Sequence, residues 1–249
     1  MYILLRLMSD ILEKKVLILV DNEYLYREFT KIVQGLDMES VEFFYGCSPG
    51  NVSLIDSNLK VYNLKYDALD ISKKFDLVIS LHCKQIFPLN LIENIRCINI
   101  HPGYNPYNRG WYPHVFSILN KLPVGATIHE MDDKIDHGPI IAQEEVNILP
   151  TDDSSSLYNR ILQAELKLIN ENLKNVIYEN YSVMEVPEGN INYKKDYEKL
   201  CEIDLHEVGT FGEFIDRLRC LTHDDYKNAY FIDENGRKIF IQIRLTLEG

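Results

Sequence analysis

Paired cysteines are missing from this sequence of 249 residues. The five cysteines are Cys47, Cys83, Cys97, Cys201 and Cys220, an odd number without any CxxC spacing. A disulfide framework needs an even set, and a structural zinc site needs closely spaced ligands, so the pattern fits neither. The simplest interpretation is a set of reduced thiols in a cytoplasmic protein.

Basic runs and long apolar runs are missing as well. The chain has 26 Lys and Arg against 38 Asp and Glu, a formal net charge of -12. Such a surface repels phosphate backbones, which excludes nucleic acid as the expected partner, although a pocket can still gather a few cations for a small anion. No window has transmembrane length, and residues 1–8 contain Arg6 and lack a small-residue cleavage site, which argues against a signal peptide.

A glycine-rich phosphate loop is also absent after the first apolar run, where residues 20–23 read Val-Asp-Asn-Glu. An ordinary NAD enzyme would carry that fingerprint. Continuous apolar runs nevertheless alternate with helical patterns, which is typical of a parallel, doubly wound α/β sheet covered by helices on both faces. The predicted strands are 15–20, 41–45, 75–81 and 96–100, and the predicted helices are 22–36 and 89–95.

The second half predicts a closing helix and a small α+β tail. Residues 151–154 supply N-cap side chains for a long amphipathic helix that runs to about Ile177. The other predicted elements are helices at 114–121 and 209–221, strands at 125–131, 139–148, 229–232 and 238–247, and a turn at 233–236. We therefore expect a main domain over residues 1–181 and a smaller C-terminal unit over residues 182–249.

The segment Cys-Ile-Asn-Ile-His-Pro-Gly at residues 97–103 carries the strongest chemical signal. Residues two apart in a strand point to the same face, so Asn99 and His101 should project together. They would do so at the carboxyl end of the strand, where open α/β sheets bind ligands. A second polar cluster, residues 129–138, contains Asp136 between two apolar runs.

Three motifs resemble the formyltransferase family that uses 10-formyltetrahydrofolate. They are Asn-Ile-His-Pro-Gly at 99–103, Asn-Pro-Tyr-Asn-Arg-Gly at 105–110 and Asp-His-Gly-Pro-Ile-Ile at 136–141. The resemblance implies a Rossmann-like fold, a catalytic trio of Asn99, His101 and Asp136, and 10-formyltetrahydrofolate as the formyl donor. Residues 105–113 and the tail at 217–231 resemble the sugar N-formyltransferase branch.

The residue types of the trio suit formyl transfer. The reaction passes through a tetrahedral intermediate with a negatively charged oxygen, which the amide of Asn99 and an imidazolium N–H of His101 can stabilise. The acceptor amine must lose a proton and the folate nitrogen must gain one, which are tasks for His101 or for a water held by Asp136. A carboxylate at Asp136 would also favour the charged imidazole. We expect orientation and charge stabilisation from Asp136 more than direct proton transfer.

The resemblance also implies binding residues and partners. The acceptor would be the amine of a dTDP-linked amino-dideoxy sugar, with dTDP-4-amino-4,6-dideoxyglucose expected, destined for a surface polysaccharide such as the O-antigen of lipopolysaccharide. A homodimer is expected, and no membrane partner. Folate contacts are expected from Leu81, Gln85, Ile86, Phe87, Asp132 and Asp133. Acceptor contacts are expected from Lys84, Asn105, Arg109, Arg219, His223, Tyr226, Asn228 and Tyr230.

Each residue also has a purely structural interpretation. Asn99 can end a strand, His101 can be a surface histidine, Asp136 can stabilise a turn before Gly138, and a large aromatic such as Trp111 more often packs against a core. Charge on an amphipathic helix is usually solvated, so at most one of Arg217 and Arg219 should face a ligand. The histidines 101, 114, 129 and 137 lack paired ligand spacing, which argues against zinc and any other metal.

Three other functions stay open. A methionyl-tRNA formyltransferase would share the trio but needs a tRNA-binding surface, which the acidic balance disfavours. A glycinamide ribonucleotide formyltransferase would leave the last fifty or so residues without a role. A catalytically silent protein that binds sugar nucleotides would bind the acceptor without turnover.

Overall fold

The computed structural model of the protein describes residues 13–38, 40–51 and 59–248. The chain divides into two compact units. The first comprises Met1–Ile100, Glu130–Asp133 and Ile169–Ser182, and the second comprises His101–His129, Lys134–Leu168 and Val183–Gly249. The prediction about a signal peptide concerns residues 1–8, which lie outside the described ranges. Within those ranges, no helix combines the length and apolar character that crossing a membrane requires.

Parallel strands form the centre of the first unit. Strand β1 pairs with β2 and β4, β2 with β3, and β4 with β5, all in parallel register. The apolar runs of β1 and β4 are buried throughout their central residues, as expected for strands with helices on both sides. The strand bounds are β1 Lys14–Val20, β2 Val41–Cys47, β3 Lys60–Val61, β4 Leu77–Leu81 and β5 Arg96–His101.

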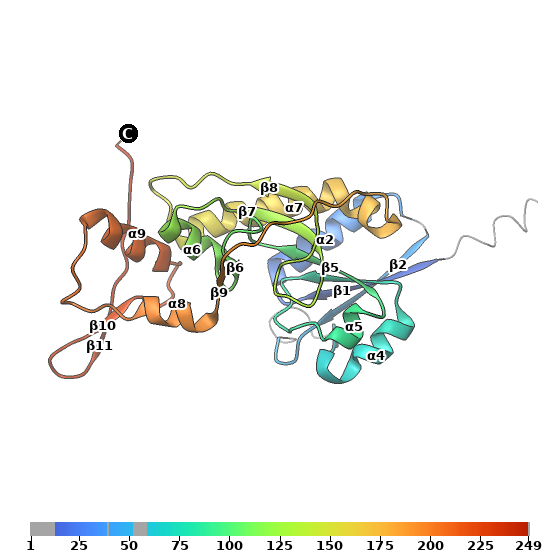
Figure 1. The fold of residues 1–249 in the computed structure, drawn as a ribbon, viewed down its shortest axis with the longest axis horizontal. Helices are drawn as coiled ribbons and strands as arrows, with labels where there is room; N and C mark the ends of the chain where they lie inside the picture. The colour runs from blue at the N-terminus through green and yellow to red at the C-terminus, as the bar shows by residue number, and fades with distance from the viewer. Residues whose placement is uncertain (1–12, 39, 52–58, 249) are drawn as a thin grey trace, which may run out of the picture. The chain divides into compact units, whose positions relative to one another are not determined.

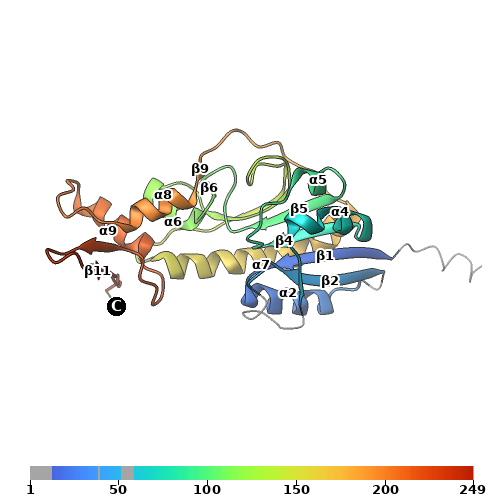
Figure 2. The ribbon, with the colours of Figure 1, turned by 90° about the horizontal axis from the view of Figure 1, so that it is seen from below.

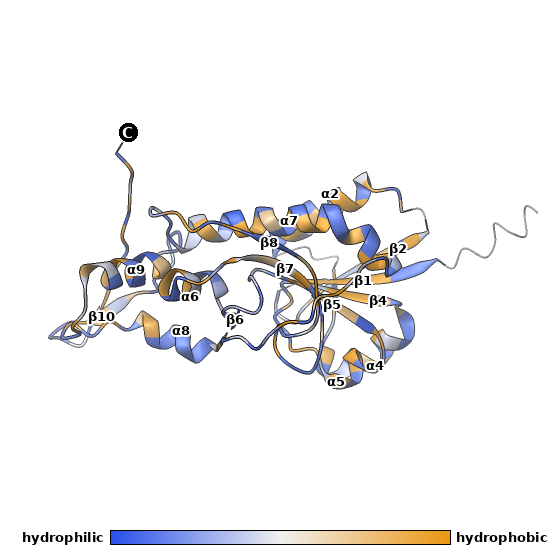
Figure 3. Ribbon diagram, turned by 45° about the horizontal axis from the view of Figure 1, so that its top comes forward, coloured by the Kyte–Doolittle hydropathy of each residue, from blue (hydrophilic) through white to orange (hydrophobic). Residues whose placement is uncertain are grey.

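Helices cover both faces of these strands (Figures 1 and 2): α4 and α5 lie on one face, and α2 with the last part of α7 on the other. On the α4 and α5 face, Leu17, Leu19, Val78 and Cys97 of the sheet share one apolar cluster with the helices. Figure 3 shows the apolar colouring of β1 and β4. The helix bounds are α2 Glu23–Gly35, α4 Leu64–Lys74, α5 Leu89–Ile92 and α7 Ser154–Tyr178.

Polar side chains fix the ends of these helices. Asn22 caps α2 by accepting the Leu25 N–H at 3.0 Å, as a side-chain oxygen at an N-cap should. At the end of α7, Arg96 Nη1 donates to the Val176 carbonyl at 2.7 Å and Lys14 Nζ donates to the Ile177 carbonyl at 3.0 Å. These cations satisfy carbonyls that a helix C-terminus leaves without intrahelical partners.

The second unit combines short strands with helices. Strand β7 pairs with β8 antiparallel, β6 with β9 parallel, and β10 with β11 antiparallel around a turn in which Gly236 has a φ of +75°. The strand bounds are β6 Arg109–Gly110, β7 Gly125–Glu130, β8 Ile140–Glu145, β9 Ile191–Asn192, β10 Tyr230–Ile232 and β11 Lys238–Phe240. The order of the seven-stranded sheet is β3-β2-β1-β4-β5-β7-β8. The predicted α/β class with a mostly parallel sheet is confirmed.

The tail shares a core with an earlier part of the chain. Helices α6 (Pro113–Asn120), α8 (Lys194–Cys201) and α9 (Phe211–Leu221) contribute to one buried cluster together with the start of α7. Ile118, Leu157 and Cys220 are members of this cluster. The tail therefore packs on residues 113–161 of its own unit. A functional boundary near residue 182 stays a prediction.

Some sequence predictions were wrong in detail. The strand expected over residues 238–247 ends at Phe240, and the helix expected over 89–95 ends at Ile92. Helices α4 and α8 were not predicted. Trp111, expected in a core, is 44% exposed, whereas the neighbouring Tyr112 packs against the buried cluster of the tail.

Candidate active site

The carboxyl end of β5 carries two of the predicted catalytic residues. Ser80 of β4 is in register with Asn99, and Leu81 with Ile100, so the strand stays regular up to this point. Asn99 is partly exposed and His101 is buried. Both lie where the last residues of a parallel strand meet the following loop, as predicted.

The loop after His101 is fixed by Thr127 of β7. The Thr127 hydroxyl donates to the Gly103 carbonyl at 2.7 Å, and Asn105 N–H donates to the same hydroxyl at 3.2 Å. Gln143 Nε2 adds a hydrogen bond to the Asn105 carbonyl at 2.8 Å. A Cβ at Gly103 would collide with the imidazole of His101, so glycine is required for the chain to turn this closely.

Asp136 lies beside His101, as predicted. Its Oδ2 is 3.6 Å from His101 Nδ1 and accepts the Gly110 N–H at 3.1 Å. The Asp136 carbonyl accepts the Asn105 side-chain amide at 2.9 Å. Asp136 has a φ of 47°, a left-handed conformation that is unusual for a residue with a side chain and that persists where surrounding contacts hold it.

His129 is a second histidine next to Asp136. Its Nε2 is 3.8 Å from Asp136 Oδ1, and its ring centroid is 6.3 Å from that of His101. Sequence reasoning considered His129 only as a metal ligand. It lies two residues after Thr127 in β7, so the alternation of a strand could have placed both side chains on the face that borders the loop.

Asn108 is a buried hydrogen-bonding centre that sequence reasoning missed. Its Oδ1 accepts the side-chain amides of Asn190 at 2.6 Å, Asn120 at 2.9 Å and Asn192 at 3.3 Å, and its Nδ2 donates to Ser117. These contacts hold β6 against β9. Because Gly110 lies in β6, they also fix the backbone N–H that binds Asp136.

Arg109, a predicted acceptor contact, is buried in β6. Its Nη2 donates to the Gly189 carbonyl at 3.2 Å. Asn105, another predicted acceptor contact, is also buried, and its side chain contacts the backbone of Asp136. The second unit therefore brings His101, Asn105, Arg109 and Asp136 together.

In the first unit, the loop after β4 is tied to the ends of β1 and β2. Asp21 accepts the Ser48 N–H at 2.8 Å, the Ser48 hydroxyl at 2.5 Å and the Lys84 N–H at 2.7 Å. Gln85 Nε2 donates to Ser48 and to the Tyr62 carbonyl, and its Oε1 accepts the Leu64 N–H at 2.9 Å. The Gln85 side chain thus holds the start of α4.

The other predicted folate contacts differ in exposure. Leu81 is buried at the end of β4, Phe87 packs partly buried against the first unit's core, and Ile86 is 83% exposed. Asp132 is partly buried and Asp133 is exposed. Ile86 therefore gives this loop an exposed apolar surface.

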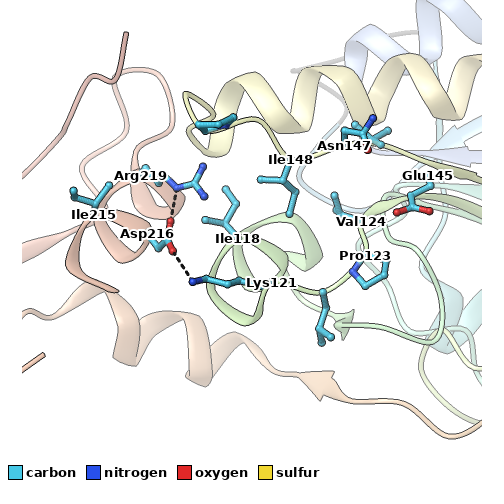
Figure 4. A pocket seen from close by; sticks show the side chains of 13 residues that line it. Ile118, Lys121, Pro123, Val124, Glu145, Asn147, Ile148, Ile215, Asp216 and Arg219 are labelled. Carbon is cyan, nitrogen blue, oxygen red and sulfur yellow. Dashed lines mark hydrogen bonds and ion pairs between the residues drawn. The ribbon is translucent and has the colours of Figure 1, made fainter. Parts of the chain in front are cut away.

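In the tail, Arg219 has extensive contacts with its own chain. It donates to Asp216 at 2.7 Å and to the carbonyls of Leu149 and Asp152 at 3.1 and 3.0 Å. Figure 4 shows Arg219 and Asp216 at the edge of a cavity of about 620 Å³, with Lys121 at 3.8 Å from Asp216. These contacts give Arg219 a structural role between α9 and the start of α7.

The remaining predicted acceptor contacts lie after α9. His223 Nδ1 is 3.0 Å from the Ser154 hydroxyl, and Tyr226, which is 66% exposed, has its ring 5.7 Å from that of His223. Asn228 donates to the Leu221 carbonyl at 2.9 Å, and the Tyr230 hydroxyl donates to Glu202 at 3.1 Å. Of these four, Tyr226 presents the most accessible aromatic ring.

A metal centre has no support in the described part of the chain, where no group of three or more His, Cys, Asp or Glu side chains is placed to hold an ion. Around the Asp136 carboxylate, His101 and His129 provide titratable groups, and the Gly110 N–H provides a hydrogen-bond donor. Such an arrangement suits acyl transfer through a charged tetrahedral intermediate.

Family models match most of the chain. Residues 60–173 match the formyl transferase family, and residues 196–247 match the N-formyltransferase dimerization C-terminal domain. A relative in Mycobacterium bovis, a dTDP-4-amino-4,6-dideoxyglucose formyltransferase, is 52% identical over 180 residues, which are 72% of this chain and 77% of the relative.

Solved structures agree with these matches. A 4-N formyltransferase from Francisella tularensis has a TM-score of 0.91 at 40% identity, with 95% of this chain and 100% of that chain covered. A formyltransferase from Anoxybacillus kamchatkensis, solved with UDP-4,6-dideoxy-4-formamido-L-AltNAc and tetrahydrofolate, has a TM-score of 0.57 at 25% identity, covering 75% of this chain and 89% of that chain.

Proposed function

The chain belongs to the formyltransferase family, among the sugar N-formyltransferases, and from this premise we propose its reaction. It moves the formyl group of 10-formyltetrahydrofolate to the amine of a dTDP-linked amino-dideoxy sugar. The acceptor is dTDP-4-amino-4,6-dideoxyglucose, because the M. bovis relative that carries this substrate in its name is 52% identical over 72% of the chain.

The observation that carries the proposal is the position of Asp136 beside His101. The 3.6 Å separation between Asp136 Oδ2 and His101 Nδ1 puts a carboxylate against an imidazole at the end of a strand. The Gly110 N–H binds the same carboxylate oxygen and fixes its orientation. This pair meets the geometric need of a general acid or base that is oriented by a third group.

We assign the roles of the trio as follows. The amide of Asn99 and an N–H of His101 donate to the oxygen that becomes negative when the amine adds to the formyl carbon. Asp136 favours the imidazolium form of His101 and orients its ring. The amine proton passes to a base in the site, and the folate nitrogen takes up a proton as the intermediate collapses to the formamide.

Folate binding is assigned to the loop after β4 and to the loop before Asp136. The exposed Ile86 and the adjacent Phe87 supply apolar surface. Leu81 is buried where the loop begins, and Gln85 accepts the Leu64 N–H at the start of α4. Asp132 and Asp133 belong to the second loop. The tetrahydrofolate-bound structure from A. kamchatkensis supports folate as the cosubstrate.

Acceptor binding is assigned first to residues close to Asp136. Asn105 donates to the Asp136 carbonyl, and Arg109 directly precedes Gly110, whose N–H binds the Asp136 carboxylate, so these two residues are the strongest candidates. Tyr226 offers an exposed ring for the thymine base, with His223 behind it. Lys84, Arg219, Asn228 and Tyr230 each have contacts with their own chain and are assigned supporting roles.

We further propose that the enzyme is a cytoplasmic homodimer and that its product enters a surface polysaccharide such as the O-antigen of lipopolysaccharide. The tail at residues 182–249 would form the contact. The dimerization-domain match and the exposed apolar side chains of Val208, Phe211 and Ile215 support this assignment. Large exposed apolar residues on one segment favour a protein contact.

The experiment that tests the reaction supplies 10-formyltetrahydrofolate with a panel of dTDP-amino sugars. Tetrahydrofolate release and a product mass increase matching one formyl group are expected with dTDP-4-amino-4,6-dideoxyglucose. Turnover on methionyl-tRNA with none on any amino sugar would overturn the proposal. Tight binding of the sugar nucleotide without turnover would indicate a silent binding protein.

Two substitutions test the roles within the reaction. Asn99→Ala and His101→Ala should each lower kcat by about a hundredfold to a thousandfold, while the Kd of the sugar nucleotide changes little. Retention of wild-type kcat by either variant would contradict its role. The size of the unfolding transition in each variant confirms that the protein remains folded.

A further inference from the structure

Three basic side chains of the second unit, one from β6 and two from the loop between β7 and β8, lie close to the carboxylate of Glu188. Glu188 lies 3.5 Å from Lys134 Nζ, 3.7 Å from His137 Nε2 and 3.8 Å from Arg109 Nη2. The Glu188 side chain is 78% exposed, whereas the Arg109 side chain is 7% exposed. The carboxylate is therefore the most accessible member of the cluster.

The segment that carries Glu188 is hydrogen-bonded on both sides of it. Met184 exchanges two backbone hydrogen bonds with Ile140, at 2.8 and 2.9 Å. After Glu188, the carbonyls of Asn190 and Asn192 accept the N–H groups of Arg109 and Trp111, where β6 and β9 lie side by side (Figure 1). The Glu188 side chain can therefore change rotamer without displacing the segment's anchors.

Arg109 retains hydrogen-bonding capacity in this setting. Its Nη2 donates to the Gly189 carbonyl, but its buried Nε has no hydrogen-bond partner among the residues that the structure describes. A guanidinium has five N–H donors and binds phosphate oxygens in a fork. By contrast, Arg219 donates to one carboxylate and to two carbonyls.

We propose that Arg109, Lys134 and His137 form an anion subsite for the diphosphate of the acceptor, and that Glu188 occupies this subsite until the diphosphate displaces it. The identity of the anion rests on the proposed function. His137 directly follows Asp136, so the subsite borders the proposed catalytic carboxylate.

The energetics favour such an exchange. An ion pair with an exposed carboxylate contributes little to stability, so displacing Glu188 costs little. A diphosphate carries more charge and more acceptor oxygens than one carboxylate, and charge-assisted hydrogen bonds to it are stronger. A singly charged anion gains less than a diphosphate from the three basic side chains, so it displaces the Glu188 carboxylate less readily.

The test measures binding of inorganic pyrophosphate and of dTDP to the full-length protein by titration calorimetry. Glu188→Gln removes the competing charge and should tighten both ligands by about threefold to fivefold. Lys134→Ala removes one contact to the anion and should weaken both by about tenfold. The matched control is Lys121→Ala, because Lys121 is an exposed lysine beside Asp216, outside the subsite, and its loss should leave both affinities unchanged.

Binding of tetrahydrofolate is measured in the same variants. Its affinity should not change in Glu188→Gln or in Lys134→Ala. Unchanged pyrophosphate affinity in both variants, or a shift in tetrahydrofolate affinity instead, would overturn the proposal. The measurement needs no turnover, so a protein that fails to transfer formyl groups can still support the subsite, and an active enzyme can still contradict it.

Discussion

Two aspartates in loops that follow strands, one in each unit, have different surroundings. Asp21 follows β1, and its carboxylate accepts two N–H groups and one hydroxyl from Ser48 and Lys84. Asp136 follows β7, and its carboxylate lies within 4 Å of the imidazoles of His101 and His129 while accepting the Gly110 N–H.

This difference is expected if Asp21 has a structural role and Asp136 has the role in the reaction that we propose for it. Backbone N–H and hydroxyl donors hold loops together through hydrogen bonds, but these donors do not titrate near neutral pH. Imidazoles do titrate there, so a carboxylate beside two of them can influence proton transfer. Substitutions in both units test whether this contrast holds.

The largest expected effect comes from replacing the two aspartates in parallel. Asp136→Asn should lower kcat by about a thousandfold, because the amide keeps the shape but loses the charge that favours an imidazolium. Asp21→Asn should instead lower the free energy of unfolding by about 1–3 kcal/mol, since an amide cannot accept all three hydrogen bonds. Steady-state kinetics and urea unfolding of both variants measure the two effects.

The comparison fails if the two variants behave alike. A similar loss of kcat in Asp21→Asn, at a protein concentration and temperature where that variant is folded, would make Asp21 part of the chemistry. Wild-type kcat in Asp136→Asn would remove Asp136 from it.

The next effect concerns buried asparagines, one from each unit. Asn108 of the second unit has hydrogen bonds to three other asparagines and to Ser117, whereas Asn51 of the first unit accepts one from Lys84. Asn108→Ala should cost about 2–4 kcal/mol of unfolding free energy, because several buried donors lose their acceptor. Asn51→Ala should cost less than about 1 kcal/mol. Equal losses in urea unfolding would show that the second unit does not depend on this centre.

A smaller effect is expected at Asp152, which is buried before α7. Burial alone would raise its pKa, but hydrogen bonds from Arg160 and from the Leu149 N–H outweigh burial and hold the pKa below the usual value. The carboxylate therefore contributes stability that is complete above the unfolded pKa of about 3.9 and is lost as pH falls through the lower folded pKa.

Asp152→Asn should accordingly cost about 1–3 kcal/mol at neutral pH, and the gap to the native protein should close at strongly acidic pH. Urea unfolding between about pH 7 and about pH 2 measures this gap. A gap that stays constant over the whole range would mean that the charge of Asp152 is not the source of its contribution.

The smallest effect concerns the thiols. Burial raises the pKa of Cys83 to about 11 and that of Cys97 and Cys220 to about 12. The thiolate is the reactive form, so these cysteines should resist alkylation near neutral pH in the folded protein. Mass spectrometry after iodoacetamide treatment tests this in both units, since Cys83 and Cys97 lie in the first and Cys220 in the second. Rapid labelling of Cys97 would contradict its burial under α4 and α5.

Much of the first unit could be predicted from the sequence. Strands such as β1 and β4 are continuous apolar runs, which only a sheet covered on both faces can bury. Asn22 and the following apolar spacing predicted α2 to within one residue at each end. Helix α4 was missed because its apolar positions, Leu64, Ala68 and Ile71, alternate with many charged residues.

Less of the second unit could be predicted. Strands β6 and β9 have two residues each and are about 80 positions apart in the chain, so no local pattern reveals their pairing. The same holds for the Asn108 centre and for the contact of Glu188 with Arg109. Trp111 was expected in a core because of its size, but it directly follows β6 and is 44% exposed.

Local patterns in the sequence identified the apolar strands β1, β2, β4 and β5, most helices and the position of Asn99 and His101 at the end of β5, because apolar periodicity and strand alternation are local properties. The three motifs also carried the resemblance to formyltransferases. Which groups surround Asp136 depended on the tertiary structure, since His101, Asn105 and Gly110 contact it from well before it in the chain. Long-range hydrogen bonds and ion pairs depend on how loops are held, and no short stretch of sequence specifies that.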